Sequence, residues 1–388
     1  MNNLQIEKLV PGGQALATLP DGKKIFLWNA LPGEIVTDFE ITKNKSHYAE
    51  GVATQLDCLS TQRIAPRDVC YLSTSPWQIM DYAYELEQKT ALLVEGFSQQ
   101  KIELSEFDLT VQTDGNAWQY RNKMEYALYY SHDDAQIHLA FHGRGSHRKI
   151  PIETSSLERP EILTRAQALV SELNQRGADA RAYQSLLLRS DQNGNASGGF
   201  YLNHQPHPEF ELLKDTLLGY EYSYSPNGFF QINLPVYELA LKEISRWIKT
   251  DQVLDLYAGV GSIGLTVARE HQLTLVECND AAYQEMVRNC TGIHNATPIL
   301  AKSEDVLEYL QPEQTVILDP PRAGCESKLI NRLLEVQPPT IIYLSCNPAT
   351  QARDVAALLS EYQIASVTPF NFFPRTPHLE NLVVLTKE

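Results

Sequence analysis

A cysteine near the end of the chain stands where a nucleophile could be activated. Cys346 follows the apolar run Ile341–Leu344, and Pro348 is suited to the first position of a helix. A cysteine just before a helix feels the positive end of the helix dipole, which favours the thiolate. A thiolate is the form that can add to an unactivated pyrimidine ring. Taken alone, a cysteine at a strand end is more often a small buried residue.

A glutamate follows in the last motif of the chain. Glu380 precedes the apolar run Leu382–Leu385 and could project into a cleft. A carboxylate that is partly removed from water has a raised pKa and can act as a general base. In isolation the residue could equally be a surface glutamate. His378, in the same segment, receives no chemical role.

A glycine-rich loop runs from Asp255 to Gly264 and contains the spacing Gly-x-Gly-x-x-Gly. Small residues at these positions let the backbone approach a ligand closely, but dinucleotide dehydrogenases share the pattern. Two acidic residues favour S-adenosylmethionine. Asp255 could face a cationic amino-acid moiety, and Glu277, at the end of the next strand, could accept hydrogen bonds from ribose hydroxyls. A tight turn without a ligand is the alternative.

Two further segments could contact a substrate. In Asp319–Arg322 two prolines stiffen a loop after an apolar strand. Amino-directed methyltransferases often place an aromatic residue after such prolines, whereas Arg322 suits a carbonyl or a phosphate better. Phe229 could stack on a base, and Gln231 could pair with the edge of a base or with the cofactor. A Phe-Phe pair is, however, usually part of a core.

The elements that position these residues follow from alternating apolar and helical patterns after residue 252. Such alternation predicts an α/β domain with a mostly parallel sheet and helices on both faces. Ligands of such sheets bind beyond the carboxyl ends of the strands, where the polar motifs fall. We expect strands over 253–256, 273–277, 316–319, 341–345 and 382–385, and helices over 263–269, 281–295, 326–336 and 349–359.

The N-terminal part reads differently. Short strands and turn signals in residues 1–57 predict a small β-barrel of OB type. Residues 58–76 look irregular, a helix is expected from Trp77 to Phe97, and Asp191–Asn195 is expected to be a turn between strands. We predict three domains: 1–57; 58–76 with 109–220, of α+β type; and 77–108 with 221–388, a Rossmann-like domain.

Composition limits the function. The 388 residues carry a net charge of −16, which argues against a basic coat for non-specific nucleic-acid binding but leaves room for a local basic surface. One candidate stretch, equally readable as a mixed surface, is Arg121, Lys123, His142, Arg144, His147, Arg148 and Lys149. We see no membrane span and no secretory signal, so a cytoplasmic protein is expected. None of the six cysteines forms a Cys-x-x-Cys pair, which argues against zinc or disulfides.

Together, the five motifs in this order resemble the RNA (uracil-5-)-methyltransferase family, which makes 5-methyluridine in tRNA and large-subunit rRNA. The resemblance is specific over residues 225–388 and weaker upstream, where residues 1–57 look like a TRAM domain. It implies a class I methyltransferase fold, S-adenosylmethionine as the methyl donor and RNA as the partner. A monomer is the simplest expectation.

The resemblance also implies roles. Cys346 matches the nucleophile that adds to C6 of uracil, and Glu380 matches the base that removes the proton from C5. Phe229 matches an aromatic residue beside the flipped base. The positions expected to bind the cofactor are Gln231, Tyr257, Gly259, Gly261, Ser262, Glu277 and Asp319. The positions expected to bind the substrate are Phe229, Arg322, Arg121 and Lys123.

The chain departs from the family in two places. Many members bind an iron–sulfur cluster through four cysteines after the TRAM domain, whereas this region offers only Cys58 and Cys70, so we predict no cluster and no metal. The usual acidic residue before the last Phe-Pro is Asn371. Three other functions remain open: an NAD-linked oxidoreductase, a cytosine-5 or amino-directed methyltransferase, and a non-catalytic RNA-binding relative. The motifs do not say which RNA is modified.

Overall fold

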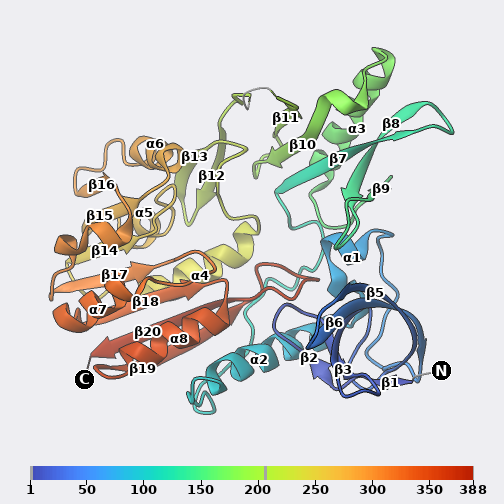
Figure 1. Cartoon of the computed structure of the whole chain (residues 1–388). Coiled ribbons are helices and arrows are strands. Elements are labelled where there is room, and N and C mark those ends of the chain that lie inside the picture. Colours follow the sequence, from blue (N-terminus) through green and yellow to red (C-terminus); the bar gives the residue numbers. More distant parts are fainter. Residues whose placement is uncertain (1–2, 205–207, 388) are drawn as a thin grey trace.

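The structure is a computed structural model that describes residues 3–204 and 208–387 (Figure 1). Its N-terminal part is a six-stranded curled sheet with the order β1-β5-β6-β4-β3-β2. The strands are β1 Leu4–Gln5, β2 Lys8–Leu9, β3 Ala15–Thr18, β4 Lys24–Trp28, β5 Ile35–Asn44 and β6 Tyr48–Asp57. Alternate side chains of β3 and β4 are buried, so the sheet closes around its own small core, as predicted for a β-barrel.

The helix expected from Trp77 to Phe97 is interrupted. Helix α1 (Tyr71–Thr74) and the 3-10 turn η1 (Pro76–Ile79) come first, and α2 (Tyr82–Ser98) follows. Met80 between them is extended and pairs with Arg63, and the Asp81 side chain caps α2 by accepting from the Ala83 N–H. Helix α2 packs against helix α8 (Pro348–Leu358) near the C-terminus, and its Leu93 and Phe97 belong to the same apolar core.

The central part is a five-stranded antiparallel sheet, β11-β10-β7-β8-β9, with α3 (Pro160–Gln175) packed on it. Its strands are β7 Lys123–Ser131, β8 Gln136–His142, β9 Lys149–Pro151, β10 Tyr183–Ser190 and β11 Ala196–Leu202. A short 3-10 turn, η2 (Ala180–Ala182), precedes β10. The predicted turn at Asp191–Asn195 joins β10 to β11, which confirms that expectation.

The C-terminal part is a seven-stranded sheet with the order β16-β15-β14-β17-β18-β20-β19. Strands β14 (Gln252–Leu256), β15 (Gln272–Glu277), β16 (Ala296–Leu300), β17 (Gln314–Leu318) and β18 (Thr340–Ser345) are parallel, whereas β20 (Glu380–Lys387) runs antiparallel between β18 and β19 (Tyr362–Phe370). The predicted Rossmann-like fold class is confirmed. Because β20 is reversed, it begins at the edge where the parallel strands end.

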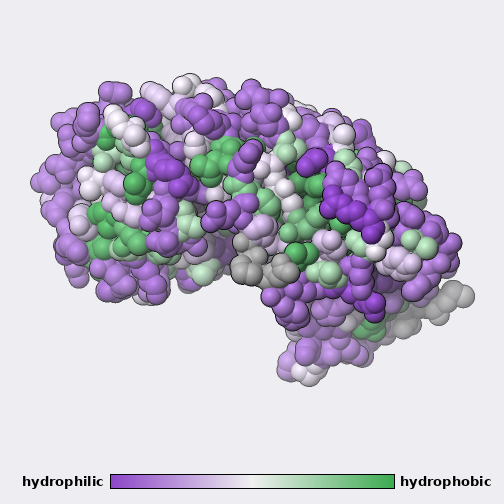
Figure 2. Space-filling model, turned by 90° about the horizontal axis from the view of Figure 1, so that it is seen from above, coloured by the Kyte–Doolittle hydropathy of each residue, from purple (hydrophilic) through white to green (hydrophobic). Residues whose placement is uncertain are grey.

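Helices cover both faces of this sheet and bury two apolar cores. They are α4 Leu234–Arg246, α5 Gly264–Val267, α6 Asp280–Asn289, α7 Ser327–Val336 and α8 Pro348–Leu358, with the short turns η3 Ser303–Asp305 and η4 Leu307–Tyr309. In Figure 2 hydrophilic residues cover most of the face that is seen, and apolar residues show in separate areas. Many of the apolar side chains are packed in the four interior cores.

Some element boundaries differ from expectation. The helix predicted over 263–269 is a single turn, and the helix predicted over 281–295 ends at Asn289 because Gly292 turns the chain with a φ of 81°. The hairpin β12 (Leu213–Leu217) and β13 (Tyr220–Tyr224) spans the predicted boundary at residue 220, and its side chains pack with the seven-stranded sheet.

Candidate active site

The carboxyl edge of the seven-stranded sheet gathers the polar motifs. Asp319 follows β17 and Cys346 follows β18, while Tyr257 follows the neighbouring strand β14. Glu380 reaches the same edge because it is the first residue of the reversed strand β20. Sequence positions more than a hundred residues apart are therefore brought to one edge by the strand order.

The thiol of Cys346 does not match the expected thiolate. Asn347 caps α8 and Pro348 takes its first turn, as predicted. The pKa of the half-buried Cys346 is nevertheless raised to about 11 by removal from water, and then by Glu380 and Asp319, with Arg322 opposing. Burial and two carboxyl groups outweigh the helix dipole. In this protein environment the Cys346 thiol is therefore neutral at pH 7.

The carboxyl group of Glu380 is almost fully buried, with 5% of the residue exposed. Burial and the neighbouring Asp319 raise its pKa well above the ordinary value, and Arg322 opposes this shift. Asp319 itself has its pKa raised to about 7 by removal from water. The site thus contains carboxyl groups that hold protons more tightly than usual, which is the property expected of a buried acid–base residue.

Arg322 is an exposed cation at this edge, held close to the start of α8. Its backbone carbonyl accepts from Asn347 Nδ2 at 2.9 Å and from Thr350 Oγ1 at 3.1 Å. Its Nη2 lies 3.2 Å from Nδ1 of His378. Burial, and then Arg322, lower the pKa of His378 to about 4, so this imidazole is neutral at pH 7 and can accept from the guanidinium.

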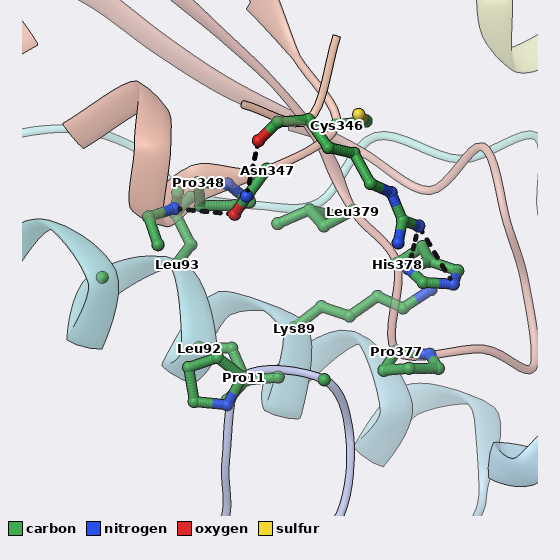
Figure 3. Close-up of a pocket in the computed structure, with 14 residues that line it drawn as sticks. Pro11, Lys89, Leu92, Leu93, Cys346, Asn347, Pro348, Pro377, His378 and Leu379 are labelled. Carbon is green, nitrogen blue, oxygen red and sulfur yellow. Dashed lines mark hydrogen bonds between the residues drawn. The ribbon is translucent and has the colours of Figure 1, made fainter. Parts of the chain in front are cut away.

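A cavity of about 220 Å³ lies beside Cys346 (Figure 3). The N-terminal barrel supplies Pro11 to its wall, helix α2 supplies Lys89 and Leu92, and the segment before β20 supplies His378. In Figure 3 the Lys89 side chain points toward His378, and Pro11 lies next to Leu92. A substrate that reaches the thiol through this cavity would therefore touch the barrel as well as the catalytic domain.

The glycine-rich loop is shaped by close backbone packing. Tyr257, Gly259 and Gly261 all have positive φ angles, of 63°, 58° and 83°. A Cβ on Gly261 would lie 2.8 Å from the side chain of Leu265, and one on Gly264 would lie 2.7 Å from Oδ2 of Asp255. Glycine is therefore required at both positions.

Several predicted cofactor residues stabilise this loop. The buried Asp255 accepts the Gly264 N–H through Oδ2 at 2.9 Å, while its buried Oδ1 has no hydrogen-bond partner among the described residues. Glu277 Oε2 accepts the Gly259 N–H at 2.9 Å. The Tyr257 hydroxyl donates to Glu304 Oε1 at 2.5 Å, and a hydrogen bond of 2.8 Å joins Ser262 to Tyr237.

These residues fit a cationic methyl donor. Burial, and then Asp319 and Glu277, raise the pKa of Asp255 to about 8. A cation at this edge would relieve the repulsion among the carboxyl groups and favour their ionised forms. S-adenosylmethionine carries positive charge on both its sulfonium and its amino group, so the donor set suits it. Ribose contacts by Glu277 stay a prediction.

The loop before α4 separates its two phenylalanines. Phe229 is 69% exposed, whereas Phe230 is buried and stacks on Tyr224 with 4.1 Å between ring centroids. Gln231 is buried. Phe230 is thus the core residue of the pair, and Phe229 is available to a base.

The basic stretch does not form one free surface. Lys123 is half-buried and donates to the carbonyls of Asn227 and Gly228, each at 3.1 Å, and burial lowers its pKa to about 8. Arg121 has its Nε buried without a partner. The guanidinium of Arg144 lies over the Trp28 ring at 4.2 Å, and Lys149 donates to a backbone carbonyl. Much of this charge therefore makes internal contacts.

In the segment where the family resemblance would place cluster cysteines, Cys58 is exposed and Cys70 is buried. Asp68 accepts from Gln78 Nε2 at 2.7 Å and from Ser156 Oγ at 2.8 Å, so hydrogen bonds join this segment to the central domain. Within residues 3–204 and 208–387, we find no group of three His, Cys, Asp or Glu side chains arranged to hold a metal.

Two sets of supporting residues were missed from the sequence. Glu85 and Lys89 on α2 form a buried ion pair of 3.0 Å, and Lys89 donates to Asn371 Oδ1 at 2.6 Å. Arg189 of β10 donates to backbone carbonyls of the loop that carries Phe229. The i,i+4 spacing of Glu85 and Lys89 on a helix was the one available signal for the first pair.

Comparison with known proteins supports this description. Residues 302–388, which include Asp319, Cys346 and Glu380, match the family model of tRNA (uracil-5-)-methyltransferase. An uncharacterized RNA methyltransferase of Thermosynechococcus vestitus is 27% identical, with 99% of this chain and 97% of the relative covered. One from Prochlorococcus marinus is 36% identical over 50% of this chain and 52% of its own length.

The crystal structure of Pyrococcus abyssi tRNA (uracil-54, C5)-methyltransferase, a complex with S-adenosyl-L-homocysteine, has the same fold. The TM-score is 0.77 at 23% identity, and 99% of this chain and all of that chain are covered. These findings confirm the predicted resemblance and the enzyme class of RNA methyltransferases. Among the described residues, none of the helices is both long and apolar enough to cross a membrane.

Proposed function

We propose that this protein methylates C5 of a uridine in RNA with S-adenosylmethionine as the methyl donor. The observation that carries the proposal is the arrival of Cys346 and Glu380 at one sheet edge, through a strand that runs opposite to its neighbours. A nucleophile and a base on the same edge are what substitution at C5 requires. The match of residues 302–388 to the uracil-5 family model supports the same reaction.

The proposed chemistry assigns one step to each residue. The Cys346 thiolate adds to C6 of the uracil, and the electron pair of the C5–C6 double bond passes to C5 and the C4 carbonyl as an enolate. When bound, S-adenosylmethionine would supply the methyl group, whose bond to the sulfonium sulfur breaks as its bond to C5 forms, so that S-adenosylhomocysteine is left. Glu380 then removes the proton from C5, and the electrons re-form the double bond as the Cys346 sulfur leaves C6.

The electrostatics of the site must change before this chemistry starts. The protein environment raises the pKa values of both Cys346 and Glu380. Arg322 lowers the pKa of each, and a cationic donor near Asp255 and Asp319 would act in the same direction. We infer that cofactor binding prepares the thiolate, so the free protein is protected from unwanted thiol reactions.

The substrate is proposed as a structured RNA, either tRNA or rRNA, with the protein acting as a cytoplasmic monomer. The cavity beside Cys346, shared by the barrel and the catalytic domain, supports contacts to RNA beyond the target base. A cytosine-5 methyltransferase is the second candidate, because it would use the same thiol addition.

The test is nucleoside mass spectrometry of RNA after incubation with the pure protein and methyl-labelled S-adenosylmethionine, with tRNA and rRNA fractions kept apart. Label in 5-methyluridine is expected, and the labelled fraction identifies the substrate class. Label in 5-methylcytidine would instead support the second candidate, a cytosine-5 methyltransferase. Cys346→Ala protein is the matched control and should leave no label.

A further inference from the structure

Side chains of the central domain donate hydrogen bonds to the backbone carbonyls of the loop of residues 227–231. Arg189 donates to the carbonyls of Gly228 and Gln231, each at 3.2 Å, and also to that of Phe230. Lys123 donates to the carbonyls of Asn227 and Gly228. The central sheet thus contacts nearly every peptide unit around Phe229.

A third residue completes this support. Asn122 Nδ2 donates to the Gln231 carbonyl at 3.0 Å, and the Asn122 N–H donates to the Ile232 carbonyl at 3.2 Å. Asn122 also accepts from Arg189 Nη2 at 3.4 Å through its Oδ1. Lys123 begins β7 and Arg189 lies in the adjacent strand β10, and Asn122 directly precedes β7. The ladder that pairs Lys123 with Arg189 therefore fixes the spacing of these side chains.

Removing the charged side chains of Arg189 and Lys123 from water costs free energy. Arg189 is fully buried, and removal from water lowers its pKa to about 10. Within the described part of the chain, neither Arg189 nor Lys123 has a carboxylate within 4 Å. Both side chains donate to backbone carbonyls instead, and the guanidinium of Arg189 also lies over the rings of Tyr224 and Phe230. The carboxyl groups of Asp215 and Glu285 raise the pKa of Arg189 but form no ion pair with it. Burying an arginine without an ion-pair partner is rarely tolerated.

The result is a rigid support under one exposed aromatic ring. Phe230 is 3% exposed and Gln231 is 7% exposed, while Phe229 between the held peptides is 69% exposed. A large apolar ring on a fixed backbone loses little further entropy when a base stacks on it. If the backbone did not fix the ring, stacking of a base on it would cost more entropy.

We propose that Arg189 and Lys123 are positioning residues that fix the 227–231 loop, so that Phe229 meets the target base and Gln231 faces the cleft. The proposal deepens the proposed function and rests on it. It also changes the expected role of Lys123 from a contact to the RNA substrate to a support for this loop. Because both residues belong to the central sheet, RNA docking there and base capture at Cys346 become mechanically linked.

The first test needs no RNA and no turnover. Hydrogen–deuterium exchange of peptides that cover residues 226–233 is measured in wild type, Lys123→Met and Arg189→Met. Exchange in both variants is expected to be at least about tenfold faster in this loop, with the seven-stranded sheet unchanged. Unchanged loop exchange in Lys123→Met would overturn the proposal. Because the Lys123 side chain is only half-buried, Lys123→Met provides the test even if Arg189→Met does not fold.

The second test separates loop support from phosphate binding. The slope of log Kd against log salt for tRNA or rRNA should be the same in Lys123→Met and wild type, because a lost phosphate contact would reduce it by about 0.7–0.9. Arg148→Met, which removes an exposed cation of the same stretch, is the matched control. A reduced slope in Lys123→Met would overturn the reassignment of Lys123.

The third test uses turnover. The kcat of Lys123→Met should fall about 10- to 100-fold while the KM for RNA changes little, because the ring is misplaced after docking. Lys123→Arg should recover most of the rate, since arginine also donates to carbonyls. A raised KM with unchanged kcat would overturn the positioning role. If wild type itself makes no 5-methyluridine, the proposed function fails, and the exchange experiment still decides whether the loop is supported as described.

Discussion

Cys346 and Glu380 both lie next to the last residue pair of the antiparallel strands β18 and β20, at the edge of the sheet. The last paired residues are Ser345 and Asn381, and one further step along each strand reaches Cys346 and Glu380. Residues opposite each other in such a pair have neighbouring side chains. The effect of Glu380 on the pKa of Cys346 agrees with this closeness. One reversed strand thus places the thiol and the carboxyl group together.

Replacement of the thiol should separate binding from chemistry. Cys346→Ala removes the group that adds to C6, so methyl transfer should fall by at least about 10⁴-fold. The cofactor loop is fixed by Asp255 and Glu277, which do not depend on the thiol, so the Kd for S-adenosylmethionine should change less than about threefold. Calorimetry and labelled-methyl transfer measure the two quantities. Retained activity would exclude the proposed mechanism.

Replacement of the carboxyl group should stop the reaction one step later. Glu380→Gln can no longer take the C5 proton, whereas Cys346 can still add to the base. A covalent protein–RNA adduct should therefore accumulate, and denaturing gel electrophoresis with labelled RNA detects it. Cys346→Ala/Glu380→Gln is the control and should give no adduct. If RNA binds to Glu380→Gln without any adduct, another residue removes the proton.

The reactivity of Cys346 should depend on pH in a defined direction. With a pKa raised to about 11, its iodoacetamide alkylation should rise about tenfold per pH unit between pH 7 and 10. Asp319→Asn removes a negative neighbour and should speed alkylation at pH 8, whereas Arg322→Gln should slow it. Peptide mass spectrometry separates Cys346 from the exposed Cys58. Equal rates in all three proteins would contradict this account of the thiol.

Much of the site could be predicted because it depends on strand ends. Apolar runs before Asp319 and Cys346 marked strands β17 and β18, and parallel strands end at one edge. Strands β16 and β19 were missed. Strand β16 is an edge strand that contains Pro298 and has no fully buried residue, and β19 carries Ser366 and Thr368 in place of a continuous apolar run.

The properties of the thiol could not be predicted from its neighbours in sequence. The helix start at Pro348 indicated a lowered pKa for Cys346, but the charge of Glu380 reaches it through the fold, across 34 positions of the chain. Lys123 likewise looked like a surface cation until the 227–231 loop folded against it. Electrostatic environment is a tertiary property, so local motifs cannot fix it.

Neutralisation of Asp255 should change how stability depends on pH. Its pKa is raised to about 8 in the folded protein, from 3.8, so the folded state binds the proton more tightly than the unfolded state. That stabilisation is complete below about pH 4 and is lost as the pH rises through about 8. Asp255→Asn keeps an oxygen that can accept the Gly264 N–H. Its Tm relative to wild type should therefore be higher at pH 8 than at pH 5.

A pH series of thermal unfolding measures this difference. The exposed Asp251→Asn is the matched control and should follow the wild-type profile. If Asp255→Asn and wild type keep the same Tm difference from pH 5 to pH 8, Asp255 is already ionised in the folded protein. The burial of the Asp255 carboxyl group under the glycine-rich loop would then need another explanation.

The buried pair on α2 should control both stability and the approach to Glu380. Glu85 and Lys89 are both fully buried and 3.0 Å apart. Lys89 also donates to Asn371 Oδ1 and to the Phe373 carbonyl, and Glu85 accepts the Arg375 N–H at 2.9 Å. The pair therefore fixes the segment that leads into β20. In Lys89→Met the carboxylate of Glu85 stays buried, and its remaining ion-pair partner among the described residues is the guanidinium of Arg375, 3.7 Å away.

Lys89→Met should lower the free energy of unfolding by about 3–5 kcal/mol, as expected when one member of a buried ion pair is removed. Glu85→Gln/Lys89→Met should cost less than the sum of the two single changes, because no unpaired charge remains. Urea unfolding measures each term, and Glu87→Gln on the exposed face of α2 is the control. Since the pair holds Asn371 and Phe373, kcat of the double variant should also fall while the Kd for S-adenosylmethionine is kept. If the losses in unfolding free energy of the two single variants add up in the double variant, and its kcat is unchanged, the pair on α2 does not position the residues of the site.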